Sequence, residues 1–444
     1  MITRIEAYNY RCFADLAINL SGFHVLAGAN GSGKSTLLDI PVLLGELLGA
    51  RRIEDAFLDP SRTTGRPPRA LSLMEPAHRG RAGGFGFAVE AQLPSPIADV
   101  IAESTRDPRF PVPTNLRYEL HLVPVDSGRG LEIAGEYLVL FHEETPVRPI
   151  PGTQAFEDPD EVRVTGRGGS RRAHPVWQQP WRPVIARIGG PVVHFTSETG
   201  PNQLKLQSQH SSLALATVPF DDTQFPAALW FQDLLRNGTV LYAPEWSALR
   251  QAAAPAGREP GLDTQGHHTP WLALQLQRED PELYEAWVDL VQLALPQVEA
   301  VEIVEREEDR YAYFRVTYTG GYQVTSSGLS DGTLRVLALT LLPYLPRTPA
   351  MLLTEEPENG IYPQAIEIVM QALRNVRGSQ ILVATQSPLV LAQVGLADVL
   401  ATRMDPSTGA VTVVRGDKHP RMADWHAGLD DLDLGTLFAT GVFE

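Results

Sequence analysis

The fold is decided by a glycine-rich stretch near the start of the sequence, which reads Gly28-Ala29-Asn30-Gly31-Ser32-Gly33-Lys34-Ser35-Thr36. Up to Ser35 it satisfies the pattern G-x-x-x-x-G-K-[ST]. An apolar run precedes it at 23–27, and apolar residues recur at helical spacing over 34–48, where Pro41 is the irregular feature. Because the pattern requires a strand before the loop and a helix after it, the sequence predicts a phosphate-binding loop.

The residue types in this loop suit the triphosphate of a nucleotide. Glycines allow backbone N–H groups to surround phosphate oxygens, and the N-terminus of the following helix adds partial positive charge. Lys34 supplies a cation for the β- and γ-phosphates, and the Ser35 hydroxyl is a ligand for Mg²⁺. We therefore expect ATP and Mg²⁺ to bind here; the alternative is a chance glycine-rich turn.

An apolar strand that ends in carboxylates forms the second informative stretch, Met351-Leu352-Leu353-Thr354-Glu355-Glu356-Pro357-Glu358. In such an arrangement one acid reaches the metal ion and the next polarises the attacking water. We expect Glu355, at a position where Asp is usual, to contact Mg²⁺ and Glu356 to orient the water. A solvated acidic turn is the alternative.

A polar turn, Leu329-Ser330-Asp331-Gly332-Thr333-Leu334-Arg335, precedes a strongly apolar run. Alone it is a helix N-cap, because Ser and Asp side chains accept hydrogen bonds from the first N–H groups of a helix. Its place shortly before the acidic strand distinguishes it from an ordinary cap.

Strands and helices alternate after residue 298, which implies a mostly parallel sheet with helices on its faces. The middle of the chain separates this part from the opening strand, loop and helix, so the sheet is split in the sequence. The expected strands are 2–9, 16–20, 23–27, 298–304, 311–317, 322–326, 351–354 and 381–384, and the expected helices are 34–48, 332–342 and 363–376.

The middle of the chain has a different character. Clusters of Pro and Gly separate short strand-like runs, which is typical of an antiparallel β insertion with long loops. Helical spacing of Leu, Trp and Ala then predicts a small helical layer. The strand-like runs are 85–93, 116–123 and 137–141, and the helical runs are 225–235 and 271–295.

Composition bounds the class of protein. With 444 residues, 43% hydrophobic and 20% charged, the sequence is that of a globular protein and not of a collagen, a disordered chain or a rod. The net charge of −16 argues against a surface that binds nucleic acid everywhere. Cys12, the single cysteine, excludes an internal disulfide, and the most apolar stretch, 336–353, is interrupted by prolines. We expect a cytoplasmic protein without a membrane span.

Taken together, these stretches resemble the ABC-like ATPases of the RecF/SMC type. The resemblance is strongest to the short AAA-family ATPases without coiled coils that occur in bacterial anti-phage and DNA-maintenance operons. The segments that carry it are 10–13 (Tyr-Arg-Cys-Phe), 28–36, 329–334, 355–363 and 383–388. The resemblance implies an α/β fold: a split ABC-type P-loop ATPase lobe, formed by 1–60 and 298–444, with a β-rich and helical lid region inserted at 61–297.

The resemblance also implies how the residues act. Two copies would face each other head to tail around ATP, with Ser330 and the Gly332 backbone of one copy reaching the γ-phosphate held by Lys34 of the other. A homodimer or larger oligomer follows. Glu356 and Gln386 are the expected catalytic residues, and Ser35 and Glu355 the metal ligands. The expected nucleotide-binding residues are Arg11, Gly28, Ala29, Asn30, Gly31, Ser32, Gly33, Lys34, Ser35, Thr36, Ser330 and Gly332.

The sequence departs from the family at three positions. Gln386 and Tyr362 stand where His is common, and Glu355 replaces Asp. Since Gln can donate a hydrogen bond to phosphate but cannot become a cation, slow turnover is expected. Gln92 is the candidate for the glutamine that links lobe and lid in this family.

The function implied is that of a sensor or regulatory ATPase of an anti-phage complex. It would act with a separate, nuclease-like effector, because the sequence carries no nuclease motif. The alternatives are a DNA-repair or chromosome-maintenance ATPase that clamps DNA directly, a non-hydrolysing ATP-dependent scaffold, and, from another class, the nucleotide-binding subunit of a transporter. The segment Glu355-Glu356-Pro357-Glu358-Asn359-Gly360 speaks against the transporter.

Several other groups have two interpretations each. Basic residues form either a phosphate track for DNA or a mobile basic loop. The pair His267-His268 near Asp263 suggests a metal site, but a flexible loop is favoured, and the run 177–181 is favoured as a core anchor over a base-stacking platform. The basic residues are Arg51, Arg52, those within 66–69, Arg163, Arg167, Arg171 and Arg172.

Overall fold

The computed structural model describes residues 1–61, 64–80, 83–104, 112–125, 128–143, 181–208, 211–255 and 260–418. The chain divides into two compact units. Unit 1 comprises Met1–Ser21, Asp39–Asn237 and Met404–Val413, and unit 2 comprises Gly22–Leu38, Gly238–Arg403 and the described residues from Val414 onward. The division falls inside helix α1 (Lys34–Gly49), which runs through Pro41.

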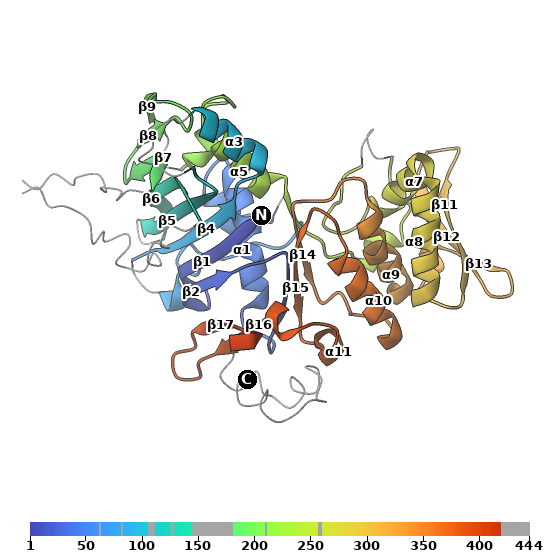
Figure 1. Ribbon diagram of the computed structural model, residues 1–444. Helices are drawn as coiled ribbons and strands as arrows, with labels where there is room; N and C mark the ends of the chain where they lie inside the picture. Colours follow the sequence, from blue (N-terminus) through green and yellow to red (C-terminus); the bar gives the residue numbers. More distant parts are fainter. Residues whose placement is uncertain are drawn as a thin grey trace, which may run out of the picture. The chain divides into compact units, whose positions relative to one another are not determined.

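Unit 1 is built on an antiparallel sheet with strand order β2-β1-β4-β5-β6-β7-β8-β9 (Figure 1). The expected antiparallel insertion is confirmed in β4, β5 and β6, and the opening strands β1 and β2 pair into the same sheet. The strands are β1 (Ile2–Tyr10), β2 (Phe13–Asn19), β4 (Phe85–Gln92), β5 (Asn115–Val125), β6 (Gly130–Phe141), β7 (Arg182–Ile188), β8 (Val192–Thr196) and β9 (Gln203–Gln207), and the helices are α2 (Asp55–Leu58), α3 (Ser95–Ser104) and α5 (Pro226–Arg236).

An ionic cluster lies inside unit 1, where neighbouring strands bring charged residues to one place. The guanidinium of Arg117, which is fully buried, donates to Glu6 over 2.6 Å, to Glu90 over 2.7 Å and to Glu119 over 2.6 Å. Each of the three glutamates is at most 5% exposed as a whole residue. A buried charge is tolerated only when its partners satisfy it, so this cluster depends on all of its members.

Unit 2 is built on a parallel sheet in which the strands follow the order β10-β14-β15-β3-β16. Since all five run in one direction, their carboxyl ends meet at one edge. This confirms the expected parallel α/β sheet, which β10 and β16 extend beyond the strands expected from sequence. The strands are β3 (Phe23–Ala27), β10 (Thr239–Leu241), β14 (Met351–Glu355), β15 (Gln380–Thr385) and β16 (Val399–Met404), and β17 (Val411–Arg415) follows along the chain.

A second sheet in unit 2 is antiparallel, with the order β11-β12-β13. The expected strands at 298–304, 311–317 and 322–326 exist, but the expectation that they join the parallel sheet was wrong. Short turns connect them as hairpins, whereas a parallel pairing needs a crossover. These strands are β11 (Val298–Glu305), β12 (Ala312–Tyr318) and β13 (Tyr322–Thr325).

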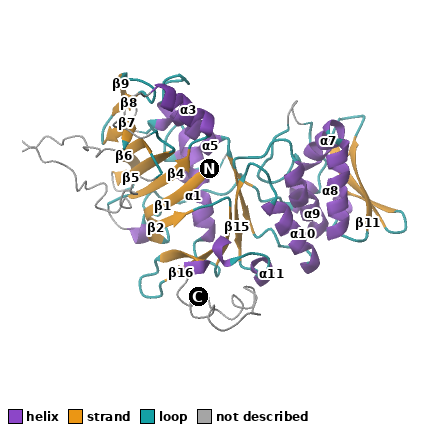
Figure 2. Cartoon of the chain, in the orientation of Figure 1, coloured by secondary structure: helices purple, strands orange, loops and turns teal. Residues whose placement is uncertain are grey.

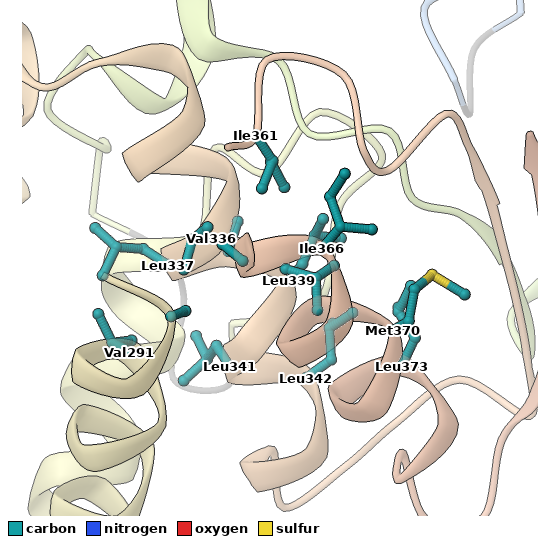
Figure 3. Close-up of a cluster of buried hydrophobic side chains, with 14 of the residues drawn as sticks. Val291, Val336, Leu337, Leu339, Leu341, Leu342, Ile361, Ile366, Met370 and Leu373 are labelled. Carbon is teal, nitrogen blue, oxygen red and sulfur yellow. The ribbon is translucent and has the colours of Figure 1, made fainter. Parts of the chain in front are cut away.

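Helices α7 and α8 pack on this antiparallel sheet, and α9 and α10 pack on α8 (Figure 2). Figure 3 shows the apolar side chains that α8, α9 and α10 bring together, among them Val291, Leu337 and Leu373. Helix α9 is buried on most sides because it lies between neighbours, which explains its strongly apolar sequence. The helices are α6 (Trp246–Leu249), α7 (Thr269–Glu279), α8 (Pro281–Ala294), α9 (Asp331–Leu341), α10 (Pro363–Arg374) and α11 (Pro388–Leu391).

Candidate active site

The glycine-rich loop follows β3 at the carboxyl edge of the parallel sheet and leads into α1. Gly31 (φ 78°) and Gly33 (φ 88°) have left-handed backbone conformations that favour glycine. Gly28 is required for another reason: a Cβ atom there would lie 2.0 Å from the Oγ1 of Thr402. Thr402 also lies 2.5 Å from the Ser32 hydroxyl, so β16 supports the loop from behind.

Lys34 folds back over this loop. Its Nζ donates to the carbonyl oxygens of Gly28, over 2.7 Å, and Ala29, over 2.9 Å. Burial lowers the pKa of Lys34, while the carboxylates of Glu356, Glu355 and Glu358 oppose that shift. Because an ammonium group has three N–H donors, one remains for a phosphate oxygen.

A cavity of about 440 Å³ lies at this edge of the sheet. It contains an ammonium group, a hydroxyl group and carboxylates, the donor set that a Mg²⁺-nucleotide needs. Lys34 and Ser35 would hold phosphate and metal, with Glu355 as the second protein ligand of the metal, and the bound Mg²⁺ would neutralise phosphate charge. The lining residues are Lys34, Ser35, Ala243, Pro244, Glu245, Trp246, Ser247, Arg335, Glu355, Glu356, Asn359 and Ala384.

Glu356 follows β14 with a left-handed backbone, φ 44°. Its carboxylate accepts from Gln386 Nε2 over 3.0 Å and from Asn359 Nδ2 over 2.5 Å. Its N–H donates to the carbonyl oxygen of Ala384 over 2.7 Å. The structure thus brings together Glu356 and Gln386, the two residues expected from sequence to be catalytic.

Glu358, the third acid of the acidic stretch, is tied to the strand that precedes Gln386. Its Oε1 accepts from the Thr385 hydroxyl over 2.5 Å. Burial raises the pKa of Glu358, and the hydrogen bond from Thr385 opposes the rise. The turn after β14 and the end of β15 are therefore linked at two points, Glu356 with Gln386 and Glu358 with Thr385.

The turn 329–335 caps α9 as expected for an N-cap. Ser330 is an exposed residue, and its hydroxyl accepts from the N–H of Thr333 over 3.1 Å. Gly332 packs within its own chain, because a Cβ atom there would lie 2.3 Å from the Gly360 carbonyl oxygen. Arg250 holds the turn by donating to Asp331 over 2.5 Å.

The remaining loop residues show that the site is open to solvent. Ala29, Asn30, Gly31 and Ser35 are exposed, and Thr36 is half-buried. Backbone N–H groups and the Ser35 hydroxyl are therefore accessible to a ligand.

Two parts of the cavity wall were not anticipated from the sequence: the segment 243–247, which follows β10, and Arg335. The Arg335 side chain lies over the Trp246 ring, with its Cζ 4.4 Å from the ring centroid. Only the tertiary pairing of β10 with β14 places 243–247 at this edge. The sequence gives no sign of this position, because β10 has only three residues and is too short to produce a recognisable strand pattern.

Other sequence candidates lie elsewhere. Arg11, in unit 1, donates from Nη2 to the Arg69 carbonyl oxygen over 2.5 Å, and its role in nucleotide binding stays a prediction. Gln92 ends β4 of unit 1. The candidates at 163–172 and 177–180 lie outside the described residues.

His267 and His268 belong to a loop in which Asp263 accepts hydrogen bonds from the main chain. The Asp263 carboxylate accepts from the backbone N–H groups of His267, over 3.0 Å, and His268, over 2.8 Å. No group of three or more metal-ligating side chains occurs within the described ranges. The same ranges contain no helix with the length and apolarity to cross a bilayer.

A phosphate loop at the carboxyl edge of a parallel sheet, with an acidic strand two positions along the same sheet, defines a P-loop nucleotide-binding protein. Residues 259–392 match the family model described as "AAA domain, putative AbiEii toxin, Type IV TA system". Over these residues the match confirms the AAA-family part of the resemblance. A search of curated proteins found no match.

Solved structures similar to this chain include heads of SMC proteins. The first, "SmcHead bound to the C-winged helix domain of ScpA", has 14% identity and a TM-score of 0.47, covering 93% of this chain and 96% of that one. An Smc head with an extended coiled coil, bound to the C-terminal domain of ScpA from Pyrococcus furiosus, has 12% identity and a TM-score of 0.46, covering 96% and 99%. The SMC head domain from Thermotoga maritima has 12% identity and a TM-score of 0.39, covering 93% and 98%.

Proposed function

We propose that this protein binds ATP with Mg²⁺ and hydrolyses it slowly, and that ATP acts as a switch for its assembly. The observation that carries the proposal is the carboxylate of Glu356, which is held by two amide side chains at the wall of the cavity that contains Lys34. An oriented carboxylate beside a phosphate site is what activation of water requires. A non-hydrolysing scaffold would not need it.

In the proposed reaction, different residues of the chain bind the phosphates, hold the metal ion and activate water. Lys34 and the loop N–H groups bind the phosphates, Ser35 and Glu355 hold the metal, and Glu356 orients and accepts a proton from the attacking water. Gln386 and Asn359 fix the orientation of the Glu356 carboxylate. Because Gln386 stays uncharged, it supplies no positive charge to the γ-phosphate, and turnover is slow.

The first experiment compares nucleotide binding with hydrolysis. Calorimetry with MgATP should give no binding for Lys34→Ala, since the cation is lost. Glu356→Gln should bind ATP with nearly wild-type affinity and release phosphate at least about tenfold more slowly. Unchanged affinity in Lys34→Ala, or undiminished hydrolysis in Glu356→Gln, would contradict the assignment.

We further propose that the protein is the regulatory ATPase of an anti-phage complex and acts with a separate effector. The family description names a putative toxin of a type IV toxin–antitoxin system, which supports a role in defence. Affinity purification of the native chain from its host, with and without ATP, should recover a nuclease-like partner. Lys34→Ala serves as the control and should lose the ATP-dependent partner.

Direct clamping of DNA is the second candidate. The sequence observation that favours it is the set of arginines at 51–69, of which Arg69 is already engaged by Asp39 and Glu46. Fluorescence anisotropy with duplex DNA, in the presence and absence of MgATP, distinguishes the two. Tight, ATP-dependent binding by the chain alone would favour the clamp over a regulator that needs a partner.

A further inference from the structure

Arg335 is a basic residue of the cavity wall that belongs neither to the phosphate loop nor to the acidic strand. It lies in the second turn of α9. Its Nη1 donates to the main-chain carbonyl oxygen of Glu356 over 2.9 Å. Trp246, over whose ring the guanidinium lies, lines the same cavity. Arg335 thus contacts the backbone of the residue proposed to activate water.

The contact falls on a residue in an unfavourable conformation. The left-handed backbone of Glu356, φ 44°, is unfavourable in a residue other than glycine and persists only where its surroundings impose it. The N–H of Glu356 is held by Ala384, its carbonyl oxygen by Arg335, and its carboxylate by Gln386 and Asn359. The backbone bond from Arg335 is therefore one of the contacts that impose the conformation.

Arg335 also connects Glu356 to the turn at the start of α9. Ser330 caps this helix, and Gly332 lies so close to Gly360 that no Cβ atom fits between them. Gly360 follows Asn359, which donates to the Glu356 carboxylate. The first turns of α9 therefore contact the segment 356–360 at two points.

The placement of Arg335 is not optimal for stability. Its Nε is buried and has no hydrogen-bond partner among the described residues. A buried donor left without a partner lowers the stability of the fold. Such departures from good packing are expected at functional positions.

We propose that Arg335 is a positioning residue for hydrolysis: it holds Glu356 in the left-handed conformation that points its carboxylate at the cavity, and it couples that conformation to the turn 329–335. The inference rests on the proposed function, because it concerns the rate of the hydrolysis assigned to the same site. It predicts that Arg335 affects turnover and not nucleotide affinity. If ATP binds between two copies, contact at Ser330 in one chain would act on Glu356 of the same chain.

The first test separates kcat from KM for MgATP. Arg335→Gln should lower kcat about 10- to 100-fold, the range expected when a reacting group is displaced by about 1 Å, with KM within about threefold of wild type. Arg335→Lys should recover part of kcat, because its ammonium can still donate to the Glu356 carbonyl oxygen. Arg374→Gln is the matched control: Arg374 also lies over an aromatic ring, with its Cζ 4.4 Å from the Phe23 centroid, but it does not line the cavity. It should leave kcat unchanged.

The second test is a double-mutant cycle with Glu356→Gln. If Arg335 acts through Glu356, adding Arg335→Gln to Glu356→Gln should lower kcat no further. Multiplied losses would overturn the proposal, as would wild-type kcat in Arg335→Gln, or a raised KM with unchanged kcat. Absence of hydrolysis by the wild-type protein would instead overturn the proposed function, and this inference with it.

Discussion

Gln386 donates a hydrogen bond from Nε2 to Oε1 of Glu356 over 3.0 Å, which links the end of β15 to the turn after β14. Each residue directly follows one of two neighbouring parallel strands, so the pairing of β14 with β15 brings the two side chains close together. The amide is an uncharged group at a position where a histidine would titrate. Under the proposed function, Gln386 helps to orient the Glu356 carboxylate and adds no ionisation of its own to the pH profile of turnover.

Gln386→Leu should lower kcat for ATP by about tenfold, because one hydrogen bond that orients the Glu356 carboxylate is lost. Affinity for MgATP should change little. Gln386→His should introduce a new ionisation between about pH 6 and 7 into the profile of kcat, since His titrates there and Gln does not. Steady-state phosphate release from pH 5.5 to 9 measures both effects, and a wild-type profile that already shows this ionisation would contradict the assignment.

The affinity for ATP should fall as the pH rises above neutrality towards 10. Burial lowers the pKa of Lys34, so the ammonium form is lost at a lower pH than in a free lysine. Phosphate oxygens favour the charged form, so the pKa of Lys34 must rise on binding, and protons are taken up at alkaline pH. Calorimetry in buffers of different ionisation enthalpy detects this uptake. Lys34→Arg, which stays charged, should show none, and equal uptake in that variant would point to another group.

Bulk at the turn 329–335 should block a contact between two chains without affecting the phosphate loop of its own chain. Ser330 is an exposed residue whose hydroxyl caps α9, and a helix N-terminus favours negative charge. Ser330→Arg should bind ATP nearly normally, form no ATP-dependent dimer in light scattering, and lose hydrolysis. Hydrolysis at the wild-type rate by this variant would refute the shared site.

Mixing Ser330→Arg with Lys34→Ala chains sharpens this test. In a head-to-tail dimer, one composite site carries both substitutions and the other carries neither. The intact site should restore part of the ATPase activity. If each chain instead formed its site alone, every site in the mixture would carry one substitution and no activity should return. A wild-type mixture diluted with inactive Ser330→Arg/Lys34→Ala chains provides the control for concentration.

Arg117→Met should destabilise unit 1 by about 3–5 kcal/mol, because it leaves Glu6, Glu90 and Glu119 buried without their common partner. Urea unfolding followed by tryptophan fluorescence measures the change. Arg315→Met, which removes a half-exposed pair with Glu302, is the control and should cost at most about 1 kcal/mol. An equal loss of unfolding free energy in the two variants would show that burial of the ion pair does not determine how much it stabilises the protein.

Much of the site was predictable because its signals are local. The spacing of Gly28, Gly33 and Lys34 encodes a turn and a helix start within one short segment, and the apolar run before Glu355 encodes a buried strand. Such signals depend on neighbours in the chain, which sequence patterns record. Gln386, by contrast, was identified through the family resemblance, as the residue that stands where His is common.

The strands 298–326 show where local signals fail. Their alternation indicated strands correctly, but the partner of a strand depends on residues distant in sequence, and the three strands pair with each other and not with the parallel sheet. The bounds of β11, β12 and β13 were therefore predictable and their sheet was not.

By itself, the sequence determined the phosphate loop, the acidic strand, the cap at Ser330 and the α/β character of the chain, because each is set by residue spacing along one segment. Only the tertiary structure decided that Arg335 reaches the Glu356 carbonyl oxygen, that 243–247 line the cavity, and that Thr402 lies behind Gly28. These contacts join residues from different strands and helices. The order of strands in the parallel sheet creates them, and that order is fixed by packing over the whole unit, not by any stretch of sequence.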